Sequence, residues 1–231
     1  MPKAGTSIED ASQTISYHLM RFLIGLVGLL LPTIIVIWSL IVFFIYEGDF
    51  QASVSDYYYT ALRNIFVGSL CAIGVFLLSY RGPNGEDKNS GIVAGLAALA
   101  VALFPTDPPM ETDLALWQEI VNTGHDIAAI ILFIMFARFC LCLFTKTDKS
   151  QEILEKTPKG ARNKSYKFCG RTILVCIALI LVNWLLTTFA GIALFTQIRP
   201  VLILEIVAIY AFAISWMTKS EALWLSDKPG E

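Results

Sequence analysis

Long apolar stretches alternate with short polar segments along this chain, and their lengths predict helices that cross a membrane. A helix needs roughly 20 apolar residues to cross a hydrocarbon core of about 30 Å. Helices are expected because each unpaired backbone group would cost several kcal/mol in lipid. We predict six membrane-spanning helices, at residues 22–46, 61–80, 91–104, 127–144, 172–195 and 201–216.

Composition agrees with this class of protein. Of the 231 residues, 56% are hydrophobic and 16% are charged, whereas a soluble domain carries about 25% charge. The predicted fold is therefore an all-α, polytopic membrane bundle with one transmembrane domain at 22–218. The first apolar run is too long for the core of a cleavable signal, so we expect it to be retained.

The segments that flank the bundle are predicted to be different in kind. Residues 1–21 contain Ile8, Ala11, Ile15 and Leu19 at helical spacing, which predicts a short amphipathic helix on the membrane surface. Residues 219–231 are expected to form a polar tail.

Basic residues are distributed asymmetrically between the loops. The two terminal segments and the loops after the second and fourth helices hold 14 of the 17 lysines and arginines. The positive-inside rule then places both termini in the cytoplasm, in a multi-pass protein of the cell membrane. Residues 145–171 carry eight bases, for which anionic lipid headgroups are expected partners at about 1 kcal/mol per base. Alternatively, these bases only set the topology; a nucleic-acid partner has no other support.

The third predicted helix is unusually short. Fourteen residues rise about 21 Å as a helix, and Gly91, Gly95, Ala98 and Ala102 line one face, which allows close packing against a neighbour. In one reading, the segment 104–107 then lies at the floor of a depression in the outer face. In the other, the helix starts near Asn84 and leaves no depression.

Several polar residues gather at the predicted extracytoplasmic face. We expect a short helix at 111–124, with Leu114, Trp117 and Val121 buried and Gly124 at its end. Three interpretations of the polar side chains stay open: helix caps and solvated acids, a metal site, or metal-free proton transfer. The candidate catalytic residues are His125, Asp107 and Asp56, and the candidate metal ligands are His125, Asp126 and Asp107.

Arg63 and Glu205 are ionisable groups placed about one turn inside predicted membrane helices. Such groups are costly in lipid and are usually paired. We predict that both face the bundle interior, where they pair with each other or with Asp56. Arg63, Glu205 and Asn64 are also the candidates for binding a ligand, while Asn183 is expected to form an interhelical hydrogen bond. The sequence identifies no cofactor.

The order of these motifs resembles that of a bacterial family of six-span membrane proteins whose function is unknown. The matching pieces are Ser55-Asp56, Arg63-Asn64, the run GLAALAVALFPTD at 95–107, and His125 followed by Ala128-Ala129. The match covers roughly residues 53–144. It implies the six-helix fold and a bacterial inner membrane, and it points to the same outer residues without supplying a reaction.

Three functions remain open from the sequence. The first is a polar extracytoplasmic site that binds or acts on a lipid or a small solute. The second is a non-catalytic bundle that binds lipid or protein, in which a homo-oligomer is an open option. The third is a proton-coupled transporter or sensor that uses Arg63 and Glu205.

Overall fold

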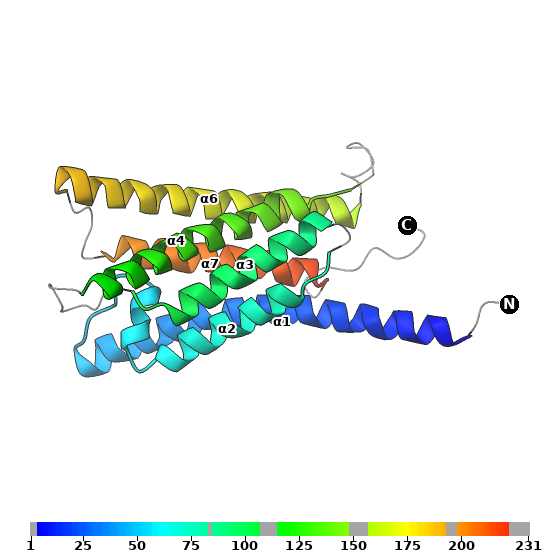
Figure 1. Cartoon of the computed structure of the whole chain (residues 1–231), viewed down its shortest axis with the longest axis horizontal. Helices are drawn as coiled ribbons and strands as arrows, with labels where there is room; N and C mark the ends of the chain where they lie inside the picture. Colours follow the sequence, from blue (N-terminus) through cyan, green and yellow to red (C-terminus); the bar gives the residue numbers. More distant parts are fainter. Residues whose placement is uncertain (1–3, 83–84, 107–114, 148–156, 193–197, 222–231) are drawn as a thin grey trace.

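The computed structural model describes residues 4–82, 85–106, 115–147, 157–192 and 198–221, with side chains from Tyr17 onward. These residues form helices and connecting segments, with no strand among them. The long helices are α1 (Ala4–Tyr46), α2 (Arg63–Ser79), α3 (Gly85–Leu103), α4 (Leu116–Arg138), α6 (Pro158–Ala190) and α7 (Pro200–Lys219) (Figure 1). A 3₁₀-helix, η1 (Ser55–Tyr59), precedes α2, and a π-helical segment, η2 (Phe139–Leu143), continues α4.

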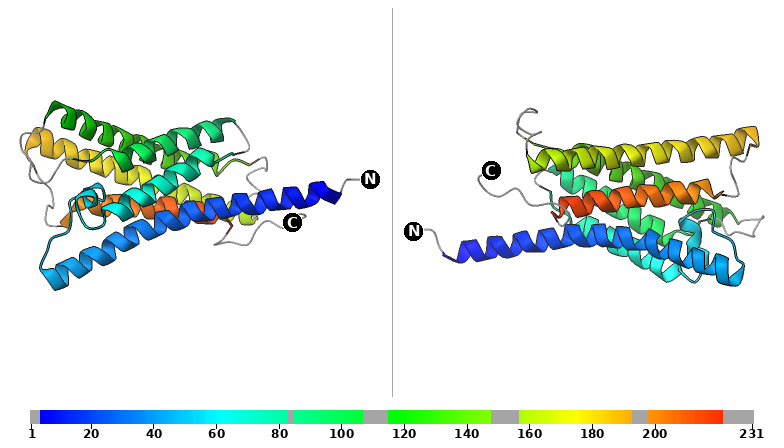
Figure 2. Two further views of the ribbon diagram at one scale, coloured as in Figure 1. Left: turned by 60° about the horizontal axis from the view of Figure 1, so that its bottom comes forward. Right: turned by 180° about the vertical axis from the view of Figure 1, so that it is seen from behind.

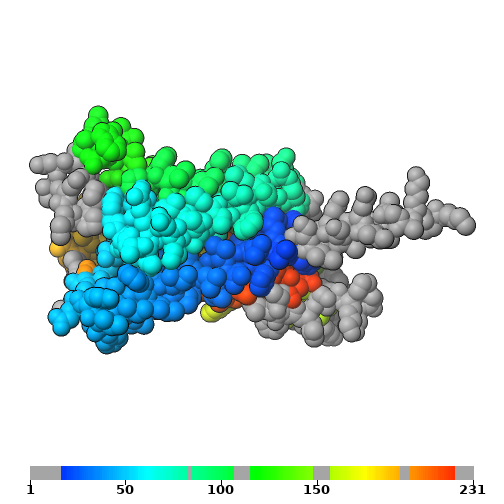
Figure 3. All heavy atoms as spheres, turned by 90° about the horizontal axis from the view of Figure 1, so that it is seen from below, coloured from blue at the N-terminus to red at the C-terminus, as the bar shows by residue number. Residues whose placement is uncertain are grey.

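The six long helices pack side by side in chain order and form a closed ring. Each contacts the next, and α7 returns to contact α1. Figure 3 shows α1 and α2 side by side over one face. Helix α1 begins and α7 ends at the same end of the bundle, which we name the terminal end; the opposite end carries η1 and the start of α2 (Figures 1 and 2).

Four helical stretches are long and apolar enough to cross a membrane: Tyr17–Tyr46, Leu116–Leu143, Pro158–Ala190 and Pro200–Lys219. Helix α2 is apolar but has 17 residues. Helix α3 has 19 residues and begins with charged side chains, Glu86 and Asp87 among them. The all-helical fold class is therefore confirmed, together with four helices of membrane-spanning length and composition.

In the first half of the chain, one predicted helix boundary is wrong and one of two open readings is confirmed. Residues 4–46 form one continuous helix with Pro32 inside it, rather than a separate surface helix followed by a span. Helix α3 starts at Gly85, as in the second reading of the short third helix. At 19 residues it rises about 28 Å, which is close to the thickness of a hydrocarbon core.

Two further boundaries differ in the second half. Helix α4 begins at Leu116 and runs without interruption through Gly124, so the predicted helix end at Gly124 is wrong, and Trp117 is 64% exposed rather than buried. Leu114 lies outside the described residues. The basic segment predicted as a loop up to residue 171 is helical from Pro158 onward, where the Thr157 side chain accepts a hydrogen bond from the Gly160 amide and caps α6.

The small-residue face of α3 brings its backbone close to α2. A Cβ atom on Gly91 would lie 2.7 Å from the Leu77 carbonyl oxygen, and one on Gly95 would lie 2.8 Å from the Gly74 carbonyl oxygen. Ala98 and Ala102 on the same face are buried. The predicted close packing is confirmed, because no larger side chain fits between the two backbones.

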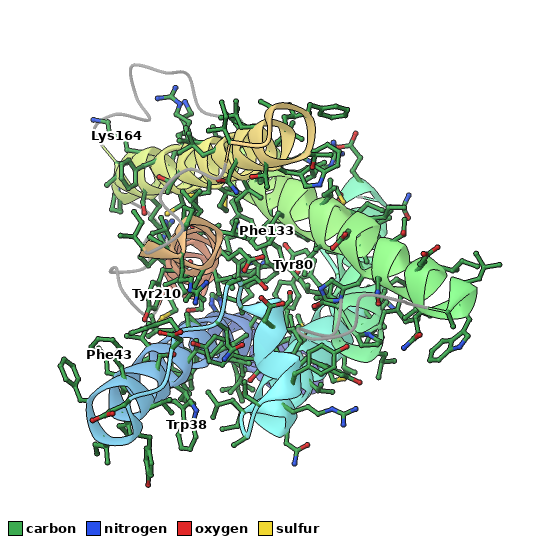
Figure 4. All side chains as sticks on the ribbon, turned by 90° about the vertical axis from the view of Figure 1, so that its left-hand side faces the viewer. Trp38, Phe43, Tyr80, Phe133, Lys164 and Tyr210 are labelled. Atoms are coloured by element: carbon green, nitrogen blue, oxygen red, sulfur yellow. The ribbon has the colours of Figure 1, made fainter. Side chains whose placement is uncertain are left out.

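Aromatic rings fill the bundle toward its terminal end. Trp216 of α7 is fully buried, with its ring centroid 5.1–5.2 Å from those of Tyr80, Phe139 and Phe144. Figure 4, viewed from the opposite end, shows Tyr80 and Phe133 in the space enclosed by the helices. Aromatic pairs at such distances contribute about 0.5–1.5 kcal/mol beyond area burial.

Helix α6 is covered along its first half only. Tyr166, Cys169, Ile173 and Cys176 are buried, but no residue from Ile177 to Ala190 is. The uncovered half is apolar and includes Trp184 and Phe189, which are 54% and 77% exposed. Such a surface suits contact with lipid tails or with another apolar helix rather than with water.

Candidate functional site

The segment between α1 and α2 folds into the opposite end of the bundle. Tyr57 of η1 is 2% exposed, and its hydroxyl pairs with the Ser39 hydroxyl of α1. Two backbone contacts join the segment to α7. The Val54 amide donates to Glu205 Oε2 at 2.6 Å, and the Leu202 amide donates to the Ala52 carbonyl at 3.1 Å. This segment is therefore held on both sides by side chains and backbone of long helices.

Asp56 lies at the centre of a hydrogen-bond network in the inserted segment. Its Oδ2 accepts from the Ser53 amide at 2.9 Å, and its Oδ1 accepts from the Thr106 hydroxyl at 3.1 Å. The Tyr59 hydroxyl donates to the Thr106 carbonyl at 2.6 Å. Asp56 thus fixes η1 to the segment that follows α3. These bonds engage both oxygens of its carboxylate, which makes it a positioning group in this structure.

An open pocket of about 610 Å³ lies beside this network, between the start of α2 and the start of α4. Its walls are mostly aromatic and polar, and they include Tyr58, Tyr59, Arg63, Pro105, Trp117 and Asn122. Pro105 is in the segment that the first reading of the third helix placed at the floor of a depression. The start of α3 at Gly85 agrees with the second reading; the depression of the first reading stays a prediction.

Arg63 is the one formally charged side chain among the described residues that line the pocket. It is exposed, so the prediction that it faces the bundle interior is wrong. Its Nη2 donates to the Tyr58 hydroxyl at 2.6 Å, and its guanidinium lies 4.3 Å from the centre of the Tyr58 ring. One face of the guanidinium is thus fixed by an aromatic ring, as in many anion sites that use arginine.

His125 lies inside α4 rather than on the pocket wall. It is 2% exposed, and its Nδ1 is 2.7 Å from the Phe104 carbonyl oxygen. Because a carbonyl only accepts, Nδ1 must carry the proton in this bond. Nε2 is buried and has no hydrogen-bond partner among the described residues. In the neutral ring that nitrogen holds a lone pair, the form needed by a base or a metal ligand.

Glu205 is partly buried on α7 and binds the Val54 amide. It lies within electrostatic range of Asp56 and Asp126. In the described structure Glu205 accepts a hydrogen bond from this backbone amide, and Arg63 donates one to the Tyr58 hydroxyl. The predicted ion pair between Glu205 and Arg63 therefore does not form. Its contact serves to anchor the inserted segment.

The remaining candidates are dispersed. Asn64 is exposed and is not part of the pocket wall. Asp126 lies inside α4, well after the helix start at Leu116, so it is not a cap of that helix. Asp107 lies outside the described residues. Within the described part of the chain, no three histidine, cysteine, aspartate or glutamate side chains are placed to hold a metal ion.

Sequence reasoning missed the contribution of α4 to the pocket. Trp117, Gln118, Val121 and Asn122 all line it. Their spacings of one and four residues place them on one helix face. We predicted Trp117 and Val121 on one face of a helix that ends at Gly124, but as buried residues, so a pocket wall was not expected there. The helix instead continues through Gly124. The reason for the glycine is tertiary: a Cβ there would lie 3.2 Å from the Phe104 ring.

Comparisons of this chain with models of protein families, with curated proteins and with solved structures found no match. The resemblance at residues 53–144 therefore stays a prediction.

Proposed function

We propose that this protein is a six-span protein of the cell membrane with both termini in the cytoplasm, and that its extracytoplasmic pocket binds an anionic group. The ligand class is a phosphate or carboxylate, carried by a lipid headgroup or by a small solute. The observation that carries the proposal is the position of Arg63, which lies in the wall of an open pocket with no carboxylate among the described lining residues.

The chemistry of the wall favours such a ligand. A guanidinium binds phosphate and carboxylate through parallel N–H bonds. Tyr58 already orients the Arg63 guanidinium, which lowers the entropy lost on binding. Trp117 and Tyr59 offer aromatic surface beside the charge, and such residues concentrate at the membrane–water interface. The pocket can therefore take a ligand with a charged group and an apolar part.

The six-span topology is supported by helix lengths and by charge. Helix α2 rises about 26 Å and α3 about 28 Å, so both approach the thickness of the hydrocarbon core. The charged start of α3 lies at the terminal end, with the basic start of α6.

Reporter fusions test this topology. A fluorescent-protein fusion after Glu231 should fluoresce, and an alkaline phosphatase fusion there should be inactive. The reverse result would place the pocket in the cytoplasm.

Binding is tested with a water-soluble short-chain lipid. We expect dihexanoyl phosphatidylglycerol to bind the detergent-solubilised protein in calorimetry, and Arg63→Gln to weaken that binding at least tenfold. The zwitterionic dihexanoyl phosphatidylcholine should bind much more weakly. Arg199→Gln is the matched control, because Arg199 is a base at the same end and is not part of the wall. Equal loss in both variants would contradict a site at Arg63.

A further inference from the structure

The pocket at Arg63 continues into an apolar surface on α4. Trp117 belongs to the pocket wall and is 64% exposed. Three isoleucines follow it on the same helix and are also exposed: Ile120, Ile127 and Ile131. Successive intervals of three, seven and four residues place these four side chains on one helix face. We define the apolar strip as Trp117, Ile120, Ile127 and Ile131, together with Phe104.

Phe104 borders the strip from the end of α3. Helix α3 packs against α4, and Phe104, which directly follows α3, is 41% exposed. A Cβ atom on Gly124 would lie 3.2 Å from the Phe104 ring, and Gly124 lies between Ile120 and Ile127 on α4. Because the next residue, Pro105, lines the pocket, the strip and the pocket meet at this segment.

The strip extends from the pocket through the depth of one membrane leaflet. Trp117 and Ile131 are 14 residues apart, which is about 21 Å along a helix. One leaflet takes up half of a hydrocarbon core of about 30 Å. No member of the strip carries a charge. A lipid of the extracytoplasmic leaflet can therefore place its headgroup in the pocket while its acyl chain stays in the hydrocarbon layer, against the strip.

The charge of the pocket wall selects among lipid headgroups. Arg63 is the one formally charged side chain among the described residues that line it. One guanidinium matches a headgroup with one net negative charge. A zwitterionic headgroup would bring a second cation to a wall whose described residues include no carboxylate to bind it, and the two cations would repel each other.

The exposure of Arg63 favours a lipid over a soluble anion. A single ion pair that is open to water binds weakly, and Arg63 is exposed. A soluble anion would depend on that pair. A lipid is confined to the leaflet beside the pocket, so its local concentration is high and its occupancy rises without any further contact.

We propose that the ligand of the pocket is an anionic phospholipid of the extracytoplasmic leaflet, with its phosphate on Arg63 and one acyl chain along the apolar strip. The lipid enters sideways from the bilayer. This inference rests on the proposed function and narrows its ligand from any phosphate or carboxylate to a membrane lipid.

The test measures how strongly brominated acyl chains quench tryptophan fluorescence. Full-length protein with Trp38, Trp184 and Trp224 replaced by phenylalanine keeps Trp117 as the reporter beside the pocket. It also keeps Trp216, which is fully buried at the terminal end. The protein is placed in phosphatidylcholine nanodiscs that contain a minor fraction of either brominated phosphatidylglycerol or brominated phosphatidylcholine.

The matched control moves the reporter away from the pocket. It carries Trp117→Phe and retains Trp184, which is 54% exposed on α6 and is not part of the pocket wall. Both brominated lipids should quench Trp184 equally, because each meets that surface only by random contact.

At the Trp117 reporter the two lipids should differ. We expect brominated phosphatidylglycerol to quench at least about twice as strongly as brominated phosphatidylcholine at the same fraction, because binding places its chain against the strip more often than random contact does. Arg63→Gln should abolish this preference.

A second reporter follows the chain along the strip. Ile127→Trp, combined with Trp117→Phe and with the other three replacements, moves the fluorophore about 15 Å along α4. The preference for phosphatidylglycerol should persist there when the bromines lie deeper in the chain. A preference at Trp117 alone would contradict the path along the strip.

The proposal is overturned if both brominated lipids quench the Trp117 reporter equally. If dihexanoyl phosphatidylglycerol still binds in calorimetry and Arg63→Gln still weakens that binding, the pocket takes a soluble anion and the proposed function stands. If the calorimetric binding does not depend on Arg63, the proposed function itself fails.

Discussion

Helices α6 and α7 behave differently at the two ends of the bundle. At the terminal end they enclose Trp216 and its aromatic neighbours, and basic side chains lie over those rings. At the opposite end α6 has no buried residue. The short inserted segment with Tyr57 covers that end of the bundle, and the open pocket lies beside this segment. Buried aromatic packing is concentrated at the terminal end, and the open pocket lies at the opposite end.

Mutations should therefore affect stability most at the terminal end and ligand binding most at the opposite end. Rings buried on all sides lose many contacts when truncated. Side chains that line an open pocket lose few, because one side of each already faces solvent or lipid.

The largest expected effect is at the terminal end. Trp216→Ala removes a fully buried ring that contacts Tyr80, Phe139 and Phe144, so we expect a loss of about 3–5 kcal/mol in unfolding free energy. Trp117→Ala at the opposite end should change stability little, because that side chain is 64% exposed. Denaturation in detergent micelles measures both; equal losses would remove the contrast between the ends.

A smaller effect is expected from two glycines. A Cβ on Gly91 would meet the Leu77 carbonyl oxygen at 2.7 Å, so Gly91→Ala should force α2 and α3 apart and cost about 1–3 kcal/mol. A Cβ on Gly124 would meet only the edge of the Phe104 ring at 3.2 Å, which can move. Gly124→Ala should therefore be neutral or stabilise α4 by up to about 1 kcal/mol. Melting temperatures of the two variants should shift in opposite directions or differ clearly in size.

The elements that sequence predicted best are those with strong local signals. Long apolar runs gave the helices, and the small-residue face of α3 gave its close packing against α2. The predicted helix boundaries were wrong where tertiary contacts outweighed a local sequence signal. Gly124 suggests a helix end, but it lies inside α4, where the absence of a side chain leaves room for the Phe104 ring. The bases from Lys159 to Arg171 suggest a loop, although their helix buries Tyr166 and Cys169.

The site could be predicted only in part, because its parts come from distant segments. Arg63 was identified by its charge, but its exposure depends on where α4 starts and where Tyr58 lies. The position of η1 depends on contacts with Ser39 and Glu205. Both residues lie far from η1 in the sequence, and no sequence pattern indicates which residues they contact. His125 was identified as unusual, yet its burial behind Phe104 follows from the register between α3 and α4.

A moderate effect is expected on the uncovered half of α6. Asn183 lies there, and its side chain makes no hydrogen bond to another described residue, so the interhelical bond predicted for it is not seen among the described residues. An asparagine amide both donates and accepts, which allows two copies to pair through the same residue. Such bonds between membrane helices are worth about 0.6–2 kcal/mol.

We therefore expect Asn183→Leu to weaken self-association in liposomes, measured by energy transfer between labelled copies at increasing dilution in lipid. Thr187→Val is the control on the same helix, because the Thr187 hydroxyl already donates to the Asn183 carbonyl. Association unchanged by Asn183→Leu would show that this surface contacts lipid alone.

The smallest expected effect compares two exposed acids in first helical turns at opposite ends. Glu86 of α3 accepts a hydrogen bond from Lys146 at 3.0 Å, which holds the pKa of its carboxyl below the usual range. Glu119 occupies the matching place in α4 without a described lysine partner.

A pKa lowered by folding gives stability that is present above the unfolded pKa and is lost as pH falls through the folded pKa. Glu86→Gln should therefore lower the melting temperature slightly at pH 7 and not at pH 3, while Glu119→Gln should show less of this dependence. Because the Glu86 pair is exposed and screened by salt, a large change at pH 7 would mean that the terminal end depends on surface charge more than on its aromatic core.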